Sequence, residues 1–170
     1  MPRVVIRSIQ AGEWQSYRTF RLQALADSPD AFATTLAQAK AFSDHDWQQR
    51  FANLSAEREF PMVAEVGGKF AGMAWAQIDP TQRTAYLFQM WVAPAHRACG
   101  VGRELLAEAI EWARSCGAAQ VVLGVTCGNS PARRLYESAG FVAVGGPEPL
   151  RPMSDLKVQN MALAVSPHAA

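Results

Sequence analysis

The sequence has few cysteines, few histidines and no excess of charge. The three cysteines, Cys99, Cys116 and Cys127, are odd in number, and their spacing matches no metal-binding pattern. They exclude a small disulfide-stapled scaffold, and no metal site is expected. Sixteen basic residues nearly balance fifteen acidic ones, for a formal net charge of +1. That balance gives no electrostatic footprint for nucleic acid or an anionic membrane, so neither is expected as a partner.

Long apolar runs are also missing. No stretch approaches the length of a transmembrane helix, and the first residues, MPRVVIRSIQ, hold no apolar segment suited to a signal peptide. Together with the odd cysteine count, this favours a reduced, cytoplasmic protein. The chain does have 170 residues, of which 49% are hydrophobic. This is enough for one substantial core, so we expect a single domain over residues 1–170.

The spacing of apolar residues predicts a mixed α/β chain. Strands are expected at residues 3–9, 60–66, 69–78, 84–92, 119–127, 141–146 and 158–165. Helices are expected at residues 13–29, from Ser43 onward, at 103–117 and at 130–140, with loop or irregular helix at 30–42. Hairpin-linked strands pair antiparallel, whereas the strand–helix–strand unit over 84–126 implies a central parallel pair. The strand at 84–92 is almost wholly apolar and is expected to be central and covered on both faces.

The segment HRACGVGRELL, residues 96–106, places Arg97, Gly100 and Gly102 where a strand leads into a helix. Glycines let the backbone approach a ligand closely, and the first N–H groups of a helix favour an anion such as a phosphate. A plain tight turn with a surface arginine would have the same spacing. The segment is not a P-loop, and Leu105 stands where a dinucleotide motif needs its third glycine.

The wider context resembles the GNAT superfamily of acetyl-CoA-dependent N-acetyltransferases. The resemblance covers about residues 84–144. It is carried by the segment MWVAPAHRACGVGRELLAEAIEWA and, after it, by VVLGVTCGNSPARRLYESAGF. The family's R/Q-x-x-G-x-G/A motif matches residues 97–102, and its N-x-x-A-x-x-L-Y-x-x-x-G-F motif matches residues 129–141. The resemblance implies a mixed, mostly antiparallel sheet with a central parallel pair, flanked by helices on both faces.

The same resemblance implies acetyl-CoA as cofactor, with coenzyme A as product, and a set of binding residues. The strand before the glycine turn is expected to splay from its neighbour and to pair its backbone with the pantetheine arm, and a backbone N–H there would stabilise the oxyanion. Tyr136 is the implied general acid for the leaving thiolate. The implied cofactor-binding residues are Met90, Trp91, Val92, Arg97, Ala98, Cys99, Gly100, Val101, Gly102, Arg103, Asn129 and Tyr136.

A general base is harder to assign, because the strand AYLFQMWV has no carboxylate. Glu65, on an earlier strand, is the candidate catalytic base, acting through water, although the pattern favours a solvated hairpin carboxylate. His45 is a second candidate. An acceptor whose amine has a pKa near 8, instead of about 10, would depend less on a general base to remove its proton.

The acceptor side is expected to be built from the N-terminal helices and the 145–155 loop. Tyr17, Phe32 and Trp47 are candidates to line it, with core packing as the alternative for each. The acceptor is expected to be an amine-bearing small molecule or peptide. A non-catalytic acyl-CoA sensor of the same fold is the alternative function. Family members are often homodimers, which makes a homodimer one possible state of this chain.

Overall fold

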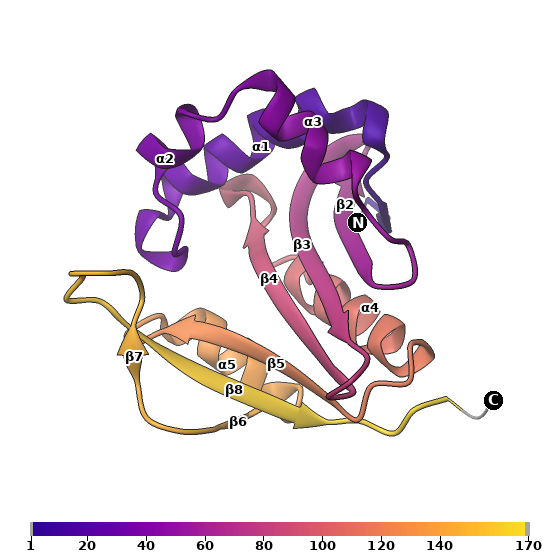
Figure 1. The fold of residues 1–170 in the computed structure, drawn as a ribbon, viewed down its shortest axis with the longest axis vertical. Coiled ribbons are helices and arrows are strands. Elements are labelled where there is room, and N and C mark those ends of the chain that lie inside the picture. The colour runs from indigo at the N-terminus through magenta and orange to yellow at the C-terminus, as the bar shows by residue number, and fades with distance from the viewer. Residues whose placement is uncertain (1, 169–170) are drawn as a thin grey trace.

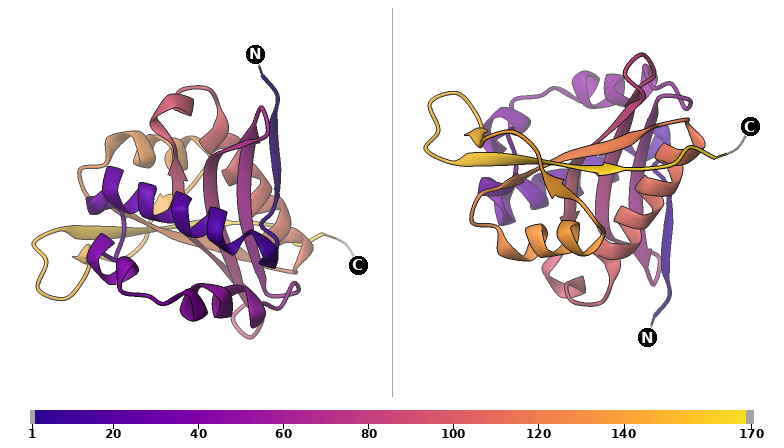
Figure 2. Two further views of the ribbon diagram at one scale, coloured as in Figure 1. Left: turned by 90° about the horizontal axis from the view of Figure 1, so that it is seen from above. Right: turned by 90° about the horizontal axis from the view of Figure 1, so that it is seen from below.

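The computed structural model describes residues 2–168 and consists of one mixed sheet flanked by helices (Figures 1 and 2). The strands are β1 (Val4–Ser8), β2 (Glu59–Val66), β3 (Lys69–Asp79), β4 (Thr84–Val92), β5 (Gln120–Thr126), β6 (Val142–Ala143), β7 (Glu148–Pro149) and β8 (Lys157–Ala164). The α-helices are α1 (Trp14–Asp27), α2 (Leu36–Lys40), α3 (Asp44–Ala52), α4 (Val101–Ser115) and α5 (Ser130–Ser138). Short 3-10 helices are η1 (Ala11–Glu13), η2 (Pro29–Ala31) and η3 (Pro94–His96). No helix within residues 2–168 is long and apolar enough to cross a membrane.

The sheet has the order β1-β2-β3-β4-β5-β8-β6, with β7 added beside β8. Neighbouring strands are antiparallel except for β4 and β5, which are parallel and are joined through α4. The expected class, a mostly antiparallel sheet with a central parallel pair, is confirmed.

Apolar side chains on the two faces of the sheet form two separate cores. Met62 and Ala64 of β2 pack against Leu105 of α4, whereas Val63 between them faces the opposite side. That opposite side is covered by α1 and α3, whose Tyr17 and other aromatic residues pack on β3 and β4. The alternation follows from the two-residue period of a strand, and it confirms helices on both faces.

Two helix starts are set by local chemistry that the sequence shows. The Ser43 hydroxyl accepts from the Asp46 N–H at 3.1 Å, and the Asp46 carboxylate accepts from the Ser43 N–H at 2.8 Å, which is a complete capping box. Asn129 caps α5 in a similar way, with its Oδ1 atom 3.4 Å from the Ala132 nitrogen. The second cap fixes the helix that carries Tyr136.

Three expectations need correction. The strand expected at 141–146 is only Val142–Ala143, and the unexpected β7 lies in the proline-rich loop after it. The segment 30–42 contains a defined helix, α2. Strand β4 is central, but the expectation that both its faces are covered is wrong at Phe88, whose surface is 46% exposed. The helices on that face pack on β4 around Trp91 and leave Phe88 uncovered.

Candidate active site

Strands β4 and β5 pair for only part of their length and then diverge (Figure 1). Their parallel register runs from Thr84 opposite Gln120 to Leu87 opposite Leu123 and ends there. Beyond that point, within residues 2–168, β4 pairs only with β3, so its backbone from Phe88 to Val92 has no strand on the β5 side. The splay expected from the resemblance is therefore present.

A β-bulge distorts β4 within the diverging part. The register against β3 shifts between Met73 and Trp75, so that β4 has one extra residue there. Gln89 adopts a positive φ of 58°, a conformation that non-glycine residues seldom take. Such bulges re-aim neighbouring groups and occur beside active sites. The bulge immediately precedes Met90, one of the predicted pantetheine-binding residues.

A cavity of about 550 Å³ opens between the end of β4, the segment that follows α1 and the starts of α4 and α5. Eleven of the twelve predicted cofactor-binding residues line it, and Cys99 is the exception. Cys99 is exposed, and its Sγ atom lies 3.4 Å from the Arg97 carbonyl oxygen. The additional lining residues, which the sequence analysis missed, are Ser28, Ala31, His96, Pro131, Ala132 and Leu135.

The glycine turn leaves the N-terminus of α4 without a side-chain cap. Ala98 and Gly100 both have positive φ values, 59° and 83°, and Gly100 is the residue at the N-cap position. Within the helix, the Glu104 N–H donates to the Gly100 carbonyl oxygen at 3.0 Å. The N–H groups before it have no intrahelical acceptor, and the helix dipole is positive there. An uncapped helix start at the wall of a cavity suits a pyrophosphate.

Arg97 is held in place by other parts of the protein. Its Nη2 atom donates to Asp27 Oδ2 at 2.5 Å, and its Nε atom donates to the Val92 carbonyl oxygen at 3.0 Å. Asp27 also accepts from the Trp91 indole N–H at 3.2 Å. The Ser28 hydroxyl, followed by Arg97, lowers the pKa of the Asp27 carboxyl group. Arg97 therefore anchors the glycine turn to the end of α1, a structural contact that the motif alone did not predict.

Tyr136 lies in the cavity wall with its ring almost entirely buried. The residue is 6% exposed, packs against Phe141, and its hydroxyl makes no hydrogen bond within residues 2–168. Burial raises the pKa of the hydroxyl to about 12. At neutral pH the group therefore keeps a proton that it can donate into the cavity.

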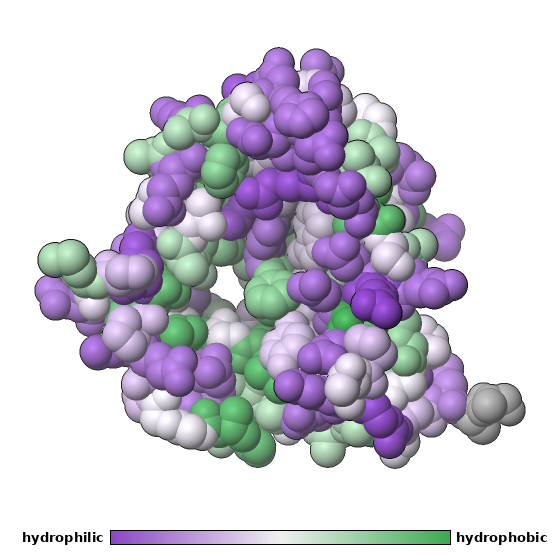
Figure 3. Space-filling view, in the orientation of Figure 1, coloured by the Kyte–Doolittle hydropathy of each residue, from purple (hydrophilic) through white to green (hydrophobic). Residues whose placement is uncertain are grey.

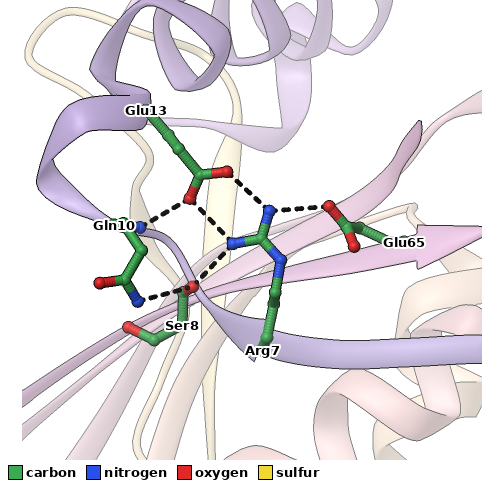
Figure 4. A network of polar contacts seen from close by, with 5 residues as sticks. All are labelled: Arg7, Ser8, Gln10, Glu13 and Glu65. Atoms are coloured by element: carbon green, nitrogen blue, oxygen red, sulfur yellow. Dashed lines mark hydrogen bonds and ion pairs between the residues drawn. The ribbon is translucent and has the colours of Figure 1, made fainter. Parts of the chain in front are cut away.

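Glu65 lies elsewhere. Its carboxylate accepts from Arg7 at 2.7 Å, and Arg7 also pairs with Glu13 at 2.6 Å (Figure 4). This network borders a different depression, of about 580 Å³, between α1 and the β2–β3 hairpin. The structure therefore does not bring Glu65 to Tyr136. His45 is exposed on the first turn of α3, and none of the residues that line the 550 Å³ cavity is an aspartate or glutamate.

The three residues that were candidates for the acceptor side are packed in the core. Tyr17, Phe32 and Trp47 are only 1%, 6% and 1% exposed. The face on which β4 and β5 diverge is hollowed between the helices above and the strands below (Figure 3). Phe88 of β4 is exposed and stacks on Tyr86, with 6.3 Å between the ring centroids.

The sequence over residues 21–141 matches the model of the acetyltransferase (GNAT) family, and the chain belongs to that family. It is 30% identical over 139 residues to mycothiol acetyltransferase of Thermomonospora curvata, across 81% of this chain and 44% of that protein. It is 34% identical over 85 residues to the L-amino acid N-acyltransferase MnaT of Escherichia coli, across 48% of this chain and 49% of that one.

A solved structure shares the fold. The structure of yncA from Salmonella typhimurium, solved with its cofactor acetyl-CoA, superimposes with a TM-score of 0.79 at 23% identity, over 99% of this chain and 97% of that chain. The chain spans less than half of the length of the mycothiol acetyltransferases that it matches.

Proposed function

We propose that residues 1–170 form a single N-acetyltransferase domain that moves the acetyl group of acetyl-CoA to a primary amine by direct attack. Membership of the family supports the reaction class, and the relative named as an L-amino acid N-acyltransferase supports nitrogen as the acceptor atom. The observation that carries the proposal is the position of Tyr136. Its hydroxyl is protonated, makes no hydrogen bond within residues 2–168, and lies in the wall of the same cavity as the uncapped start of α4.

In this proposal the chain holds the cofactor along two surfaces. The backbone of the turn at residues 97–103 binds the pyrophosphate, while Arg97 keeps the turn against Asp27. The unpaired backbone of β4 from Met90 to Val92 pairs with the pantetheine arm, and one of its N–H groups stabilises the oxyanion. Asn129 contributes its side-chain amide from the start of α5.

Acetyl transfer forms a C–N bond and breaks the thioester C–S bond. Tyr136 donates its proton to the sulfur as the thiolate leaves, which completes the thiol of coenzyme A. The acceptor nitrogen loses one proton, and because no carboxylate lines the cavity, that proton passes to water. The amine must then be neutral when it attacks, which favours acceptors whose pKa is low or whose charge is suppressed on binding.

Release of free thiol from acetyl-CoA, measured across a panel of amines, tests the proposal. Tyr136→Phe should keep the affinity for coenzyme A and lower turnover by roughly 10²-fold or more, the usual contribution of a general acid. Tyr86→Phe is the matched control, because Tyr86 lies outside the cavity and its hydroxyl is 3.2 Å from Gln82. Equal turnover in Tyr136→Phe and wild type would remove Tyr136 from the mechanism. Tight binding of acetyl-CoA without thiol release for any amine would favour the sensor.

A further inference from the structure

Arg21 on α1 is a buried cation without a counter-ion. Its side chain is 6% exposed, and its guanidinium carbon lies 4.4 Å from the centre of the Phe32 ring. It takes part in none of the ion pairs found within residues 2–168. Its Nη1 atom is fully buried and has no hydrogen-bond partner. Burial, and to a smaller extent the charge of Arg50, lowers the pKa of the guanidinium to about 10.

An unpaired buried charge is unfavourable, and proteins normally pair such groups. Stacking on Phe32 satisfies one face of the guanidinium plane but none of its N–H donors. The planar fork of donors matches a carboxylate, to which arginine can donate two parallel hydrogen bonds. The unfilled donors of Arg21 therefore fit an anion that comes from outside the chain.

A second cation, Arg50 on α3, reinforces the positive potential. Its guanidinium carbon lies 5.0 Å from the centre of the Phe42 ring and 5.2 Å from that of Trp47, and it also makes no ion pair within residues 2–168. The nearest acid on the same helix, Asp46, is one turn away and is engaged by the Ser43 N–H as a helix cap. The charge of Arg50 thus acts on the Arg21 guanidinium, and neither arginine pairs with a carboxylate within residues 2–168.

The cluster is connected to the bulge of β4. Tyr17 lies one turn before Arg21 on α1, on the same face of the helix, and its hydroxyl donates to Gln89 Oε1 at 2.5 Å. Gln89 directly precedes Met90, where the pantetheine arm is expected to run. Hydrophilic side chains line the upper wall of the hollow on this side of the molecule, below α1 and α3 (Figure 3). The face of α1 that carries Arg21 is therefore linked through Tyr17 to the bulge of β4.

We propose that Arg21, supported by Arg50, binds a carboxylate of the acceptor, so that the acceptor is a small molecule with both an amine and a carboxylate, in the class of the α-amino acids. This inference rests on the proposed function. It adds Arg21 as a specificity-determining residue on the face opposite α4 and α5, and it explains why the chain keeps an uncompensated charge there.

Matched pairs of acceptors test the inference. Thiol release is measured with L-leucine, L-methionine and L-phenylalanine, each beside its amide, which keeps the side chain and the amine but lacks the carboxylate. The amide amine is the less basic of the two, so intrinsic reactivity favours the amide. We expect the wild type to prefer the acids by at least tenfold in kcat/KM. Arg21→Met should raise KM for the acids by about 10- to 100-fold, the size of a charge-assisted hydrogen bond, and bring the acid-to-amide ratio close to one.

Arg21→Met should fold, because replacing an uncompensated buried charge by an apolar side chain of similar size is often neutral or stabilising. Arg18→Met is the control on the same helix, since Arg18 is exposed and pairs with Asp44 at 2.8 Å. It should leave the acid-to-amide ratio unchanged. Arg21→Lys should recover part of the preference, because it restores the charge without the fork of donors.

A binding measurement makes the test independent of turnover. With coenzyme A present, calorimetry with N-acetyl-L-leucine should show binding to the wild type and at least tenfold weaker binding to Arg21→Met. Equal rates for acids and amides, unchanged by Arg21→Met, would overturn the inference while leaving the proposed function standing. If no acceptor supports the release of thiol from acetyl-CoA, the proposed function is overturned instead. The calorimetry then decides by itself for or against the anion site.

Discussion

Gly102 offers a sharp test of the proposed pyrophosphate site at the turn of residues 97–103. Gly102→Ala adds one carbon atom and Gly102→Val adds three, and the two substitutions should differ in effect. A Cβ atom on Gly102 would lie 3.3 Å from Leu135 Cδ2 and 3.6 Å from Val92 Cγ2. Alanine then fits if the leucine moves by a few tenths of an ångström, and the family motif also accepts alanine at this position. Valine would add two more methyl groups in the same space, and overpacking of this kind is typically unfavourable by about 1–3 kcal/mol.

The effect on the cofactor follows from the backbone. Valine at residue 102 projects into the wall of the cavity and separates the first N–H groups of α4 from a phosphate. Losing one charge-assisted hydrogen bond, about 1.5–3 kcal/mol, weakens binding about 10- to 100-fold. Gly102→Ala should bind coenzyme A as the wild type does, with a stability gain of up to about 1 kcal/mol from helix propensity.

Calorimetry with coenzyme A, beside thermal unfolding of each variant, measures both quantities. Gly12→Ala serves as the control, because nothing lies within 4 Å of a Cβ atom there. Unchanged affinity for coenzyme A in a folded Gly102→Val protein would refute the placement of the pyrophosphate at this turn.

The remaining predictions concern protons. Because burial raises the pKa of Tyr136 to about 12, the proposed general acid stays protonated through the working range, and the rate should rise with pH until the acceptor's own amine is neutral. For two acceptors of different amine pKa, the rising limb of the pH–rate profile should shift by about that difference, and Glu65→Gln should change it little. If the limb stays near pH 6 to 7 for both acceptors and is lost in Glu65→Gln, the protein uses a carboxylate base instead. Asp27→Asn should lower stability by about 1 kcal/mol or less, since its pair with Arg97 is partly exposed. Because the pKa of Asp27 is lowered on folding, its contribution is present above about pH 4 and is lost as pH falls through the folded-state value, so denaturation midpoints of wild type and Asp27→Asn should converge in acid.

Features encoded over a few residues could be predicted from the sequence. The capping box at Ser43 and the glycine turn before α4 depend on neighbours within one helical turn. Gly102 and Tyr136, both taken from the family motifs, line one cavity, because a strand–helix–strand crossover brings the starts of both helices to the same end of the sheet.

Contacts between distant segments could not be predicted. Asp27 and Arg97 are 70 positions apart, and Arg7 and Glu65 are 58 apart, so no local pattern shows either pair. The exposure of Phe88 depends on how far the helices above β4 extend. Strand β7 has only two residues and no periodicity to detect. The burial of Arg21 could not be predicted either, because an arginine on a helix normally reaches solvent.

The separation of the two cores has a consequence for how this molecule can change. The residues that support the glycine turn and Tyr136 belong to one core, whereas Tyr17, Trp47 and the packing around Arg21 belong to the other. Substitutions in distant, non-contacting sites add their free energies almost independently. Substitutions on α1 to α3 can therefore accumulate without loosening the opposite face, provided that Asp27, whose carboxylate holds Arg97 of the glycine turn, is kept. The sheet thus separates the side chains of the proposed acceptor site from most of those that support the glycine turn, so one set can change while the other is conserved.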